Sequence, residues 1–512
     1  MKRGLFLLGL LLLLRAPAQA VDLKLAVLFS DHMVLQRDKP VPVWGWADPG
    51  ERLTVEFAGR KKTVVADAEG KWRVALDAMS ASAEGRALVV QSESGARKVE
   101  IRDVLVGEVW LGSGQSNMAW TVARSRDFDK EKAAANLPLI RMFREDSNGS
   151  PTMQTNGKGK WTVCAPDTLG PFSATLYFFG RDLHRELKVP IGLINSSVGG
   201  TPIESWIAGE AQGRTPELKA SYEAEARAYA EFDVAKAKAN YETALARWTE
   251  RVEKAKAAGE TPPAKPADPV ETRNRRAGPG GLFNGKIAPL IPYAVRGILW
   301  YQGEANASPV LGPRYQYQLS LLVQDWRARW GDELPFAWVQ LPNFIRDGEG
   351  WMLVRESMLK TLRLPKTGMA ITVDIGEPKD IHPTNKQDVG KRLSMWALGA
   401  VYKKKGIAVS GPLPATHRVE GERVVVKFKH ADGGLQAKGG ELTGFVIAGE
   451  DRQWKPATAR IEGDKVIVSS PDVKQPVAVR YAWAADPTCN LYNGQGLPAS
   501  PFRTDDWVAP VK

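Results

Sequence analysis

The chain has 512 residues, of which 43% are hydrophobic, and it carries a formal net charge of +12 at neutral pH. At roughly 100–200 residues per domain, this length predicts about three domains with substantial cores and argues against a single domain. Lysine and arginine are spread along the chain without a long block of like charges. We therefore predict no nucleic-acid partner, because a basic interface needs clustered charge.

The first 20 residues have the pattern of a secretory signal peptide. Lys2 and Arg3 precede an apolar run from Leu5 to Leu14, and Ala18-Gln19-Ala20 has the small-residue spacing that signal peptidase requires. No later segment approaches the roughly 18 apolar residues of a membrane-spanning helix. We therefore predict an exported protein, periplasmic or extracellular, with no membrane span. Cys164 and Cys489 are the only cysteines, and their pairing stays open.

Residues 21–103 are predicted to form an N-terminal β-sandwich. Short β-rich runs alternate there with turn residues, as in small sandwich domains. The runs are 40–45, 53–57, 72–76 and 87–90.

Residues 104–405 have the pattern of an α/β domain. Apolar runs that end in glycine-rich or polar loops alternate with helical patterns, which indicates a mostly parallel sheet covered by helices. The runs are 104–111, 191–194, 297–301, 336–340 and 369–373.

An insertion at 209–280 interrupts this domain. It contains an Ala/Glu/Lys-rich helix with one narrow apolar face, followed by the proline-rich segment 261–266, which cannot continue a helix. We expect a surface hairpin or lid rather than a catalytic element. From residue 406 to 512 the short-strand pattern returns, and a C-terminal β-domain is predicted. Its runs are 424–426, 444–447, 465–468 and 478–481.

The loop after the first α/β strand presents a candidate nucleophile. In Gly112-Ser113-Gly114-Gln115-Ser116-Asn117-Met118, two glycines permit a sharp turn with Ser116 near its tip. A serine hydroxyl needs such exposure to attack a carbonyl carbon. Met118 stands where an α/β-hydrolase elbow has its last glycine, and a glycine-serine loop alone is more often structural. Ser116 therefore needs a base before it becomes a candidate.

Histidine is the usual base near neutral pH, and elimination among the five histidines leaves one. His184 lies on the solvated face of a predicted helix. His382, in Asp380-Ile381-His382-Pro383, follows the last predicted strand of the α/β domain, and Thr384 or Asn385 is expected to cap the next helix. The remaining three lie in or near the flanking β-domains: His32, His417 and His430.

Two further loops at strand ends carry potential donors to an oxyanion. Gly199 and Gly200 follow one strand, and Gln302 follows the next. Backbone N–H groups and a side-chain amide at such positions can stabilise the charge that develops on a carbonyl oxygen. The backbone N–H of Ser116 would complete this set. Each loop alone is a weak signal.

The four loops, in this order, resemble those of the SGNH-type esterases and, within them, the sialate O-acetylesterase family. Further similarity lies in the flanking β-domains, so the resemblance covers nearly the whole mature chain. The matching site blocks are 114–118, 199–206, 300–304 and 380–383, and the flanking ones are 29–37, 489–493 and 496–498.

The resemblance implies an SGNH, flavodoxin-like three-layer α/β/α catalytic domain and no metal or cofactor. It implies hydrolysis of acetyl esters on sugar hydroxyls through an acetyl-enzyme on Ser116. His382 would be the base, and Ser116, Gly199 or Gly200, and Gln302 would contact the oxyanion. Many SGNH enzymes have asparagine where this chain has Gln302, so its role is inferred from position.

The acid behind His382 departs from the SGNH pattern. The broader SGNH pattern places the acid three residues before the histidine, where this chain has Lys379, whereas Asp380 is two before. Asp380 is our prediction for the orienting acid, with Asp374, Glu377 or a Ser-His pair without an acid as alternatives.

The sugar is also undetermined, and acetylated xylan or another polysaccharide would suit the same loops as a sialic acid ester. A different class stays open as well. The 17 tryptophans of the chain would allow a non-catalytic glycan-binding protein. The sequence does not indicate an oligomeric state.

Overall fold

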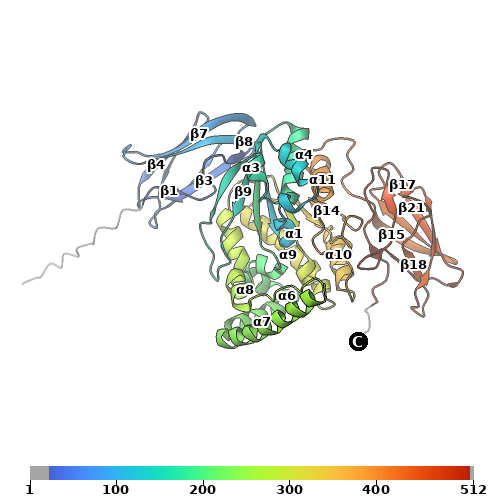
Figure 1. Cartoon of the computed structure of the whole chain (residues 1–512). Helices are drawn as coiled ribbons and strands as arrows, with labels where there is room; N and C mark the ends of the chain where they lie inside the picture. The colour runs from blue at the N-terminus through green and yellow to red at the C-terminus, as the bar shows by residue number, and fades with distance from the viewer. Residues whose placement is uncertain (1–21, 508–512) are drawn as a thin grey trace, which may run out of the picture.

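The structure is a computed structural model that describes residues 22–507. An N-terminal β-region, a central α/β region and a C-terminal β-region follow one another along the molecule, as Figure 1 shows. The predicted signal peptide, residues 1–20, lies outside the described residues. Between residues 22 and 507, none of the helices combines the length and apolar character needed to cross a membrane. Both cysteines are free.

The N-terminal region consists of two sheets around a shared apolar core, and the predicted runs are confirmed as strands. One sheet has the order β1-β3-β6, and in the other β4 pairs with β5 and β7, and β7 pairs with β8. The strands are β1 (Lys24–Leu25), β2 (Val34–Gln36), β3 (Val41–Trp46), β4 (Arg52–Phe57), β5 (Arg60–Val65), β6 (Lys71–Leu76), β7 (Ser82–Ser92) and β8 (Lys98–Gly114).

Strand β8 joins this region to the central one without a break. Its first half pairs with β7 and its second half with β11 and β12. The boundary expected at 103/104 therefore falls inside one continuous strand. Asp103, at this point, has a positive φ of 54°, and its carboxylate pairs with Arg141 and His32.

The central sheet has the order β10-β9-β11-β8-β12-β13-β14. All pairs from β9 to β14 are parallel, and β10 is antiparallel at the edge. The other strands are β9 (Leu137–Glu145), β10 (Gly159–Cys164), β11 (Ile191–Ser197), β12 (Gly297–Tyr301), β13 (Phe336–Val339) and β14 (Thr367–Ala370). Strand β12 is buried along its whole length, as expected for a sheet covered on both faces.

Helices cover the two faces of this sheet, and neighbouring strand residues point to opposite cores. Trp110 and Leu299 pack with helices α4 (Ala174–Leu187) and α11 (Lys386–Trp396) in one core. Leu111 and Trp300 belong to the other core, which includes residues of α9 (Leu311–Trp330) and α10 (Gly350–Thr361). The predicted cap of the next helix is confirmed as Asn385, whose side chain accepts the Asp388 N–H.

Short helices fill the connections between these elements. They are α1 (Ser116–Ala119), η1 (Val122–Arg124), α2 (Phe128–Ala133), α3 (Pro166–Leu169), η2 (Ile203–Trp206), η3 (Phe283–Ile287), η4 (Ala288–Leu290), η5 (Glu304–Asn306) and η6 (Ala397–Val401).

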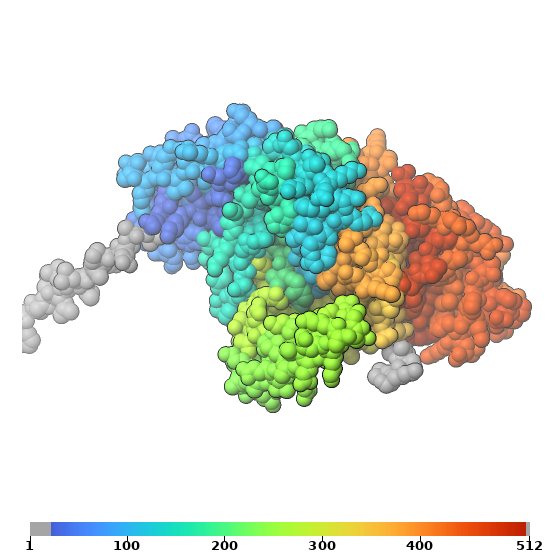
Figure 2. Space-filling view, viewed as in Figure 1, coloured from blue at the N-terminus to red at the C-terminus, as the bar shows by residue number. Residues whose placement is uncertain are grey.

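The insertion is helical and projects at the lower front of the molecule, drawn in green in Figure 2. Its longest helix ends before the proline-rich segment, as the sequence predicts. Trp248 on that helix donates its indole N–H to the Pro263 carbonyl, which folds the segment back along the helix. The helices are α5 (Gly209–Arg214), α6 (Pro216–Ala230), α7 (Val234–Ala257) and α8 (Pro269–Arg276).

The C-terminal region has its own apolar core between two four-stranded sheets. Buried Arg355 of α10 ties it to the central region by donating to the carbonyls of Leu341, Pro342, Ala484 and Ala485. The strands are β15 (Leu413–Glu420), β16 (Arg423–Lys429), β17 (Leu435–Ala437), β18 (Phe445–Ala448), β19 (Lys455–Pro456), β20 (Thr458–Glu462), β21 (Lys465–Ser469), β22 (Ala478–Tyr481), β23 (Leu491–Asn493) and β24 (Phe502–Arg503).

Candidate active site

The carboxyl ends of neighbouring parallel strands bring the predicted loops together. Strand β8 ends at Gly114, which is in register with Ser197 of β11 and Tyr301 of β12. Gly114 has a φ of 138°, and a Cβ there would lie 2.1 Å from the Tyr301 carbonyl oxygen. Only glycine fits this close approach. The turn it permits starts α1 at Ser116.

Ser116 and His382 form a hydrogen-bonded pair. The distance between His382 Nε2 and Ser116 Oγ is 2.8 Å, although the two residues are 266 positions apart in the chain. Both side chains are partly exposed. A hydroxyl within hydrogen-bond reach of an imidazole is the arrangement that a serine nucleophile and its base require. The structure thus brings together the two residues that the sequence selected.

The imidazole of His382 is held from two sides. The ring of Trp120 stacks on it, with 5.1 Å between centroids and an interplanar angle of 15°. Asp380 accepts the backbone N–H of His382 at 2.8 Å, and the same carboxylate oxygen lies 3.7 Å from Nδ1. That distance is too long for a hydrogen bond but short enough for an electrostatic interaction. Trp120 was not selected from the sequence.

Burial lowers the pKa of His382 below its usual value. The charges of Lys386 and Arg124 lower this pKa further, whereas Asp380 raises it. The imidazole is therefore neutral at pH 7, which is the form that accepts a proton from a hydroxyl.

The carboxylates of the two alternative acids bind residues other than His382. Asp374 forms a two-fold ion pair with Arg392, at 2.6 and 2.8 Å, and accepts the Tyr492 hydroxyl at 3.1 Å. Glu377 accepts both the backbone N–H and the hydroxyl of Thr384 at 2.7 Å. Of the three candidate carboxylates, Asp380 is the one that faces the imidazole.

A buried polar network links the nucleophile loop to the histidine loop. Glu304 of η5 accepts the side-chain amides of Gln115 and Asn117, the residues on either side of Ser116. Asn117 also donates to the Ile381 carbonyl at 3.0 Å. Its oxygen accepts the Lys386 ammonium at 2.7 Å. The residues next to Ser116 and His382 are thus fixed to one another.

Lys386 and Glu304 are ionisable groups whose pKa values are shifted in opposite directions. Burial lowers the pKa of Lys386 to about 7, although the carboxylate of Glu304 counteracts this. Burial raises the pKa of Glu304. Both shifts have the sign expected for charges removed from water. Neither residue is predicted as a site residue from the sequence, because their spacing along the chain gives no sign that they are connected.

Of the two candidate glycines, Gly199 lies against the nucleophile. A Cβ at Gly199 would be 3.4 Å from Ser116 Cβ, whereas one at Gly200 would have no neighbour within 4 Å. Gly200 has a φ of 67° and turns the loop. Its carbonyl accepts the guanidinium of Arg276 from α8 of the insertion. The insertion therefore contacts the glycine loop.

Gln302 does not present its amide to Ser116. The side chain is fully buried, and its Nε2 donates to the Thr201 carbonyl at 3.2 Å and to Asn306 Oδ1 at 2.8 Å. Its Oε1 accepts the Tyr315 hydroxyl. An amide has only two N–H donors, and both donors of Gln302 are used in these two hydrogen bonds. Neither is therefore free to bind an oxyanion. This placement argues against the predicted donor role, and Gln302 instead positions the loop that follows the glycines.

The family model described as carbohydrate esterase, sialic acid-specific acetylesterase matches residues 285–398. The chain is 28% identical to the sialate O-acetylesterase of Mus musculus, over 96% of both proteins. It is 26% identical to the sialate O-acetylesterase of Homo sapiens, over 94% of this chain and 92% of the human protein. The crystal structure of a carbohydrate acetylesterase from Xanthomonas citri has a TM-score of 0.80 and 39% identity, covering 95% of this chain and 100% of that one.

The mixed α/β fold and these similarities define a carboxylic ester hydrolase that acts on carbohydrate acetyl esters. The chain belongs to the sialate O-acetylesterase family of carbohydrate esterases.

Proposed function

We propose that this protein removes O-acetyl groups from sugars through an acetyl-enzyme on Ser116. The observation that carries the proposal is the 2.8 Å distance between Ser116 Oγ and Nε2 of a neutral His382. A serine hydroxyl at its ordinary pKa is a weak nucleophile, and an adjacent base overcomes this.

In the first step, His382 Nε2 takes the hydroxyl proton while Ser116 Oγ bonds to the acetyl carbon. The tetrahedral intermediate then collapses, the bond from the acetyl carbon to the sugar oxygen breaks, and the imidazolium protonates the departing sugar alkoxide. In the second step, His382 takes a proton from water as the hydroxide adds to the acetyl carbon. The bond from that carbon to Ser116 Oγ then breaks, the imidazolium returns its proton to Oγ, and acetic acid is released. Asp380 stabilises the imidazolium through its charge, at 3.7 Å from Nδ1.

The backbone N–H groups of Ser116 and Gly199 are proposed as the oxyanion donors. The Ser116 N–H is at the first position of α1 and has no acceptor one turn back in the helix. Gly199 packs directly on Ser116. Removal of one oxyanion donor typically lowers turnover by about 10²–10³.

The proposed organisation is an SGNH-type three-layer catalytic domain with a β-sandwich domain before it and a β-domain after it. The divisions are residues 21–103, 104–405 with the insertion 209–280, and 406–512. The helices on both faces of the parallel sheet support the three layers. The pattern of residues 1–20 supports export to the periplasm or the medium.

Two acetylated substrates are tested side by side, O-acetylated sialic acid and acetylated xylan, with acetate release as the readout. The similarity to sialate O-acetylesterases supports the first. Ser116→Ala and His382→Ala are each expected to lower kcat by more than about 10³-fold, because the two residues act as a unit. Ser113→Ala is the matched control, since this buried hydroxyl near the end of β8 makes no hydrogen bond within the described residues.

Full activity of the Ser116→Ala variant would overturn the proposed nucleophile. Retention of glycans without acetate release from either substrate would favour the non-catalytic glycan-binding alternative. A faster reaction with acetylated xylan would reassign the substrate while leaving the mechanism in place.

A further inference from the structure

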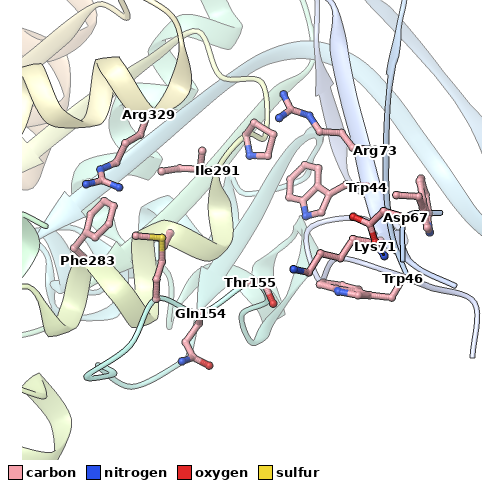
Figure 3. A pocket seen from close by; sticks show the side chains of 15 residues that line it. Trp44, Trp46, Asp67, Lys71, Arg73, Gln154, Thr155, Phe283, Ile291 and Arg329 are labelled. Carbon is pink, nitrogen blue, oxygen red and sulfur yellow. Dashed lines mark hydrogen bonds between the residues drawn. The ribbon is translucent and has the colours of Figure 1, made fainter. Parts of the chain in front are cut away.

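A cleft lies between the N-terminal β-region and the central region, away from the Ser116–His382 pair. The cleft has a volume of about 540 Å³, and none of its lining residues belongs to the candidate active site. One wall is the face of β3 and β6, and the other is formed by residues of η3, η4 and the end of α9 (Figure 3). The loop after β9 lines the cleft between these walls with Met153, Gln154 and Thr155.

The β3–β6 wall carries alternating aromatic rings and cations. Trp44 is opposite Arg73 and Trp46 is opposite Lys71 in the antiparallel register, so the four side chains share one face of the sheet. Trp44 is anchored from behind by an edge-to-face contact with Phe29, at 4.7 Å between centroids. Trp46 is only partly buried. Trp44 is buried in the apolar core, so the ring available on this wall is that of Trp46, which can stack on the apolar face of a sugar.

Lys71 and Arg73 are exposed and have no ion-pair partner within residues 22–507. By contrast, Arg329 on the opposite wall is paired with Glu210 and Asp325. Asp67 is the one carboxylate among the lining residues, and its Oδ1 accepts two backbone N–H groups in the turn between β5 and β6. The unpaired charge at the cleft is thus predominantly positive.

Polar groups that are free to hydrogen-bond a ligand also line the cleft. The Thr155 hydroxyl and the Gln154 Oε1 have no protein partner in the described part of the chain, and both residues are exposed. Met153, half exposed, adds an apolar contact in the same loop. A partly exposed aromatic ring, free hydroxyl-binding groups and unpaired cations together match a ligand that has an apolar ring face, many hydroxyls and negative charge.

We propose that this cleft binds an acidic oligosaccharide, with a sugar ring on Trp46 and carboxylates at Lys71 and Arg73. The site would hold a charged glycan chain on the protein independently of the Ser116–His382 pair. A neutral glycan would use the Trp46 ring and the polar groups without the cations, and would bind more weakly.

The test is isothermal titration calorimetry of the full mature chain with a galacturonic acid hexamer, and with xylohexaose as the neutral counterpart. Lys71→Gln combined with Arg73→Gln should weaken binding of the acidic hexamer about tenfold, since two exposed charge contacts are lost, and leave xylohexaose binding unchanged. Trp46→Ala should weaken binding of both hexamers. Lys61→Gln combined with Lys429→Gln is the matched control, because both lysines are exposed and lie outside the cleft.

Three results would overturn the proposal. They are absence of binding by the acidic hexamer, equal binding of the two hexamers, and an equal loss in the control double variant, which would indicate attraction to overall positive charge. Hydrolysis of an aryl acetate should stay at the wild-type rate in all these variants. Because the hexamers carry no acetyl groups, failure of the cleft and failure of the catalytic proposal are distinguishable.

Discussion

Replacing Glu304 with glutamine tests whether the buried network holds the nucleophile loop. The variant keeps the size of the side chain but changes one carboxylate oxygen into an NH₂ group. That group would face the amide of Gln115 or Asn117, donor against donor. One buried donor then loses its acceptor, and Lys386 loses the carboxylate that counteracts the lowering of its pKa by burial.

An unsatisfied buried donor costs about 1–3 kcal/mol, and removal of a nearby buried charge adds to it, so the free energy of unfolding should fall by about 2–4 kcal/mol. Because the two amides flank Ser116, a looser loop should lower kcat about tenfold or more, with little change in KM for a small substrate.

Urea unfolding followed by tryptophan fluorescence measures the first effect, and hydrolysis of an aryl acetate by the folded variant measures the second. Glu69→Gln is the matched control, because this glutamate is exposed and its carboxylate makes no hydrogen bond within the described residues. Its effect should stay within about 0.5 kcal/mol. Wild-type stability and kcat in Glu304→Gln would refute the role assigned to the network.

Three other substitutions test separate features. Asp380→Asn removes the charge that raises the pKa of His382, so the acidic limb of kcat/KM should move to lower pH while the plateau falls about tenfold. Gly199→Val places methyl groups against Ser116 and should lower kcat about 10²-fold by disturbing the oxyanion donor. Arg355→Leu leaves four carbonyls without their donor and should lower the free energy of unfolding by about 3–5 kcal/mol in urea.

Each of these has a contrary result and, where the chain offers one, a matched control. An upward shift of the acidic limb in Asp380→Asn would contradict the sign of the interaction. Gly200→Ala has free space for the methyl group, so it should lose only about 1–2 kcal/mol of stability, from the positive φ. Equal loss of kcat in Gly199→Val and Gly200→Ala would remove the distinction between the two glycines. Arg363→Leu changes an exposed arginine and should leave stability nearly unchanged.

The loops that carry chemistry are recognisable from the amino-acid sequence alone. Glycines at strand ends and the small number of histidines pointed to Ser116 and His382, because turn residues and titratable groups are visible without a fold. The alternation of apolar runs with helical patterns indicated a parallel sheet, and the order of the loops along the chain implied that they meet at its carboxyl edge. These features depend on local composition and period, which one sequence displays directly.

The contacts between side chains, by contrast, are seen only in the folded structure. It placed Trp120 on the imidazole and joined Glu304 to both neighbours of Ser116. Both amide donors of Gln302 bind other groups, the Thr201 carbonyl and Asn306 Oδ1. Side-chain direction and competing hydrogen-bond partners come from segments far apart in the chain, so spacing in the sequence contains no signal for them. For the same reason, the cleft between β3, β6 and the central region became visible only once its two walls were brought together.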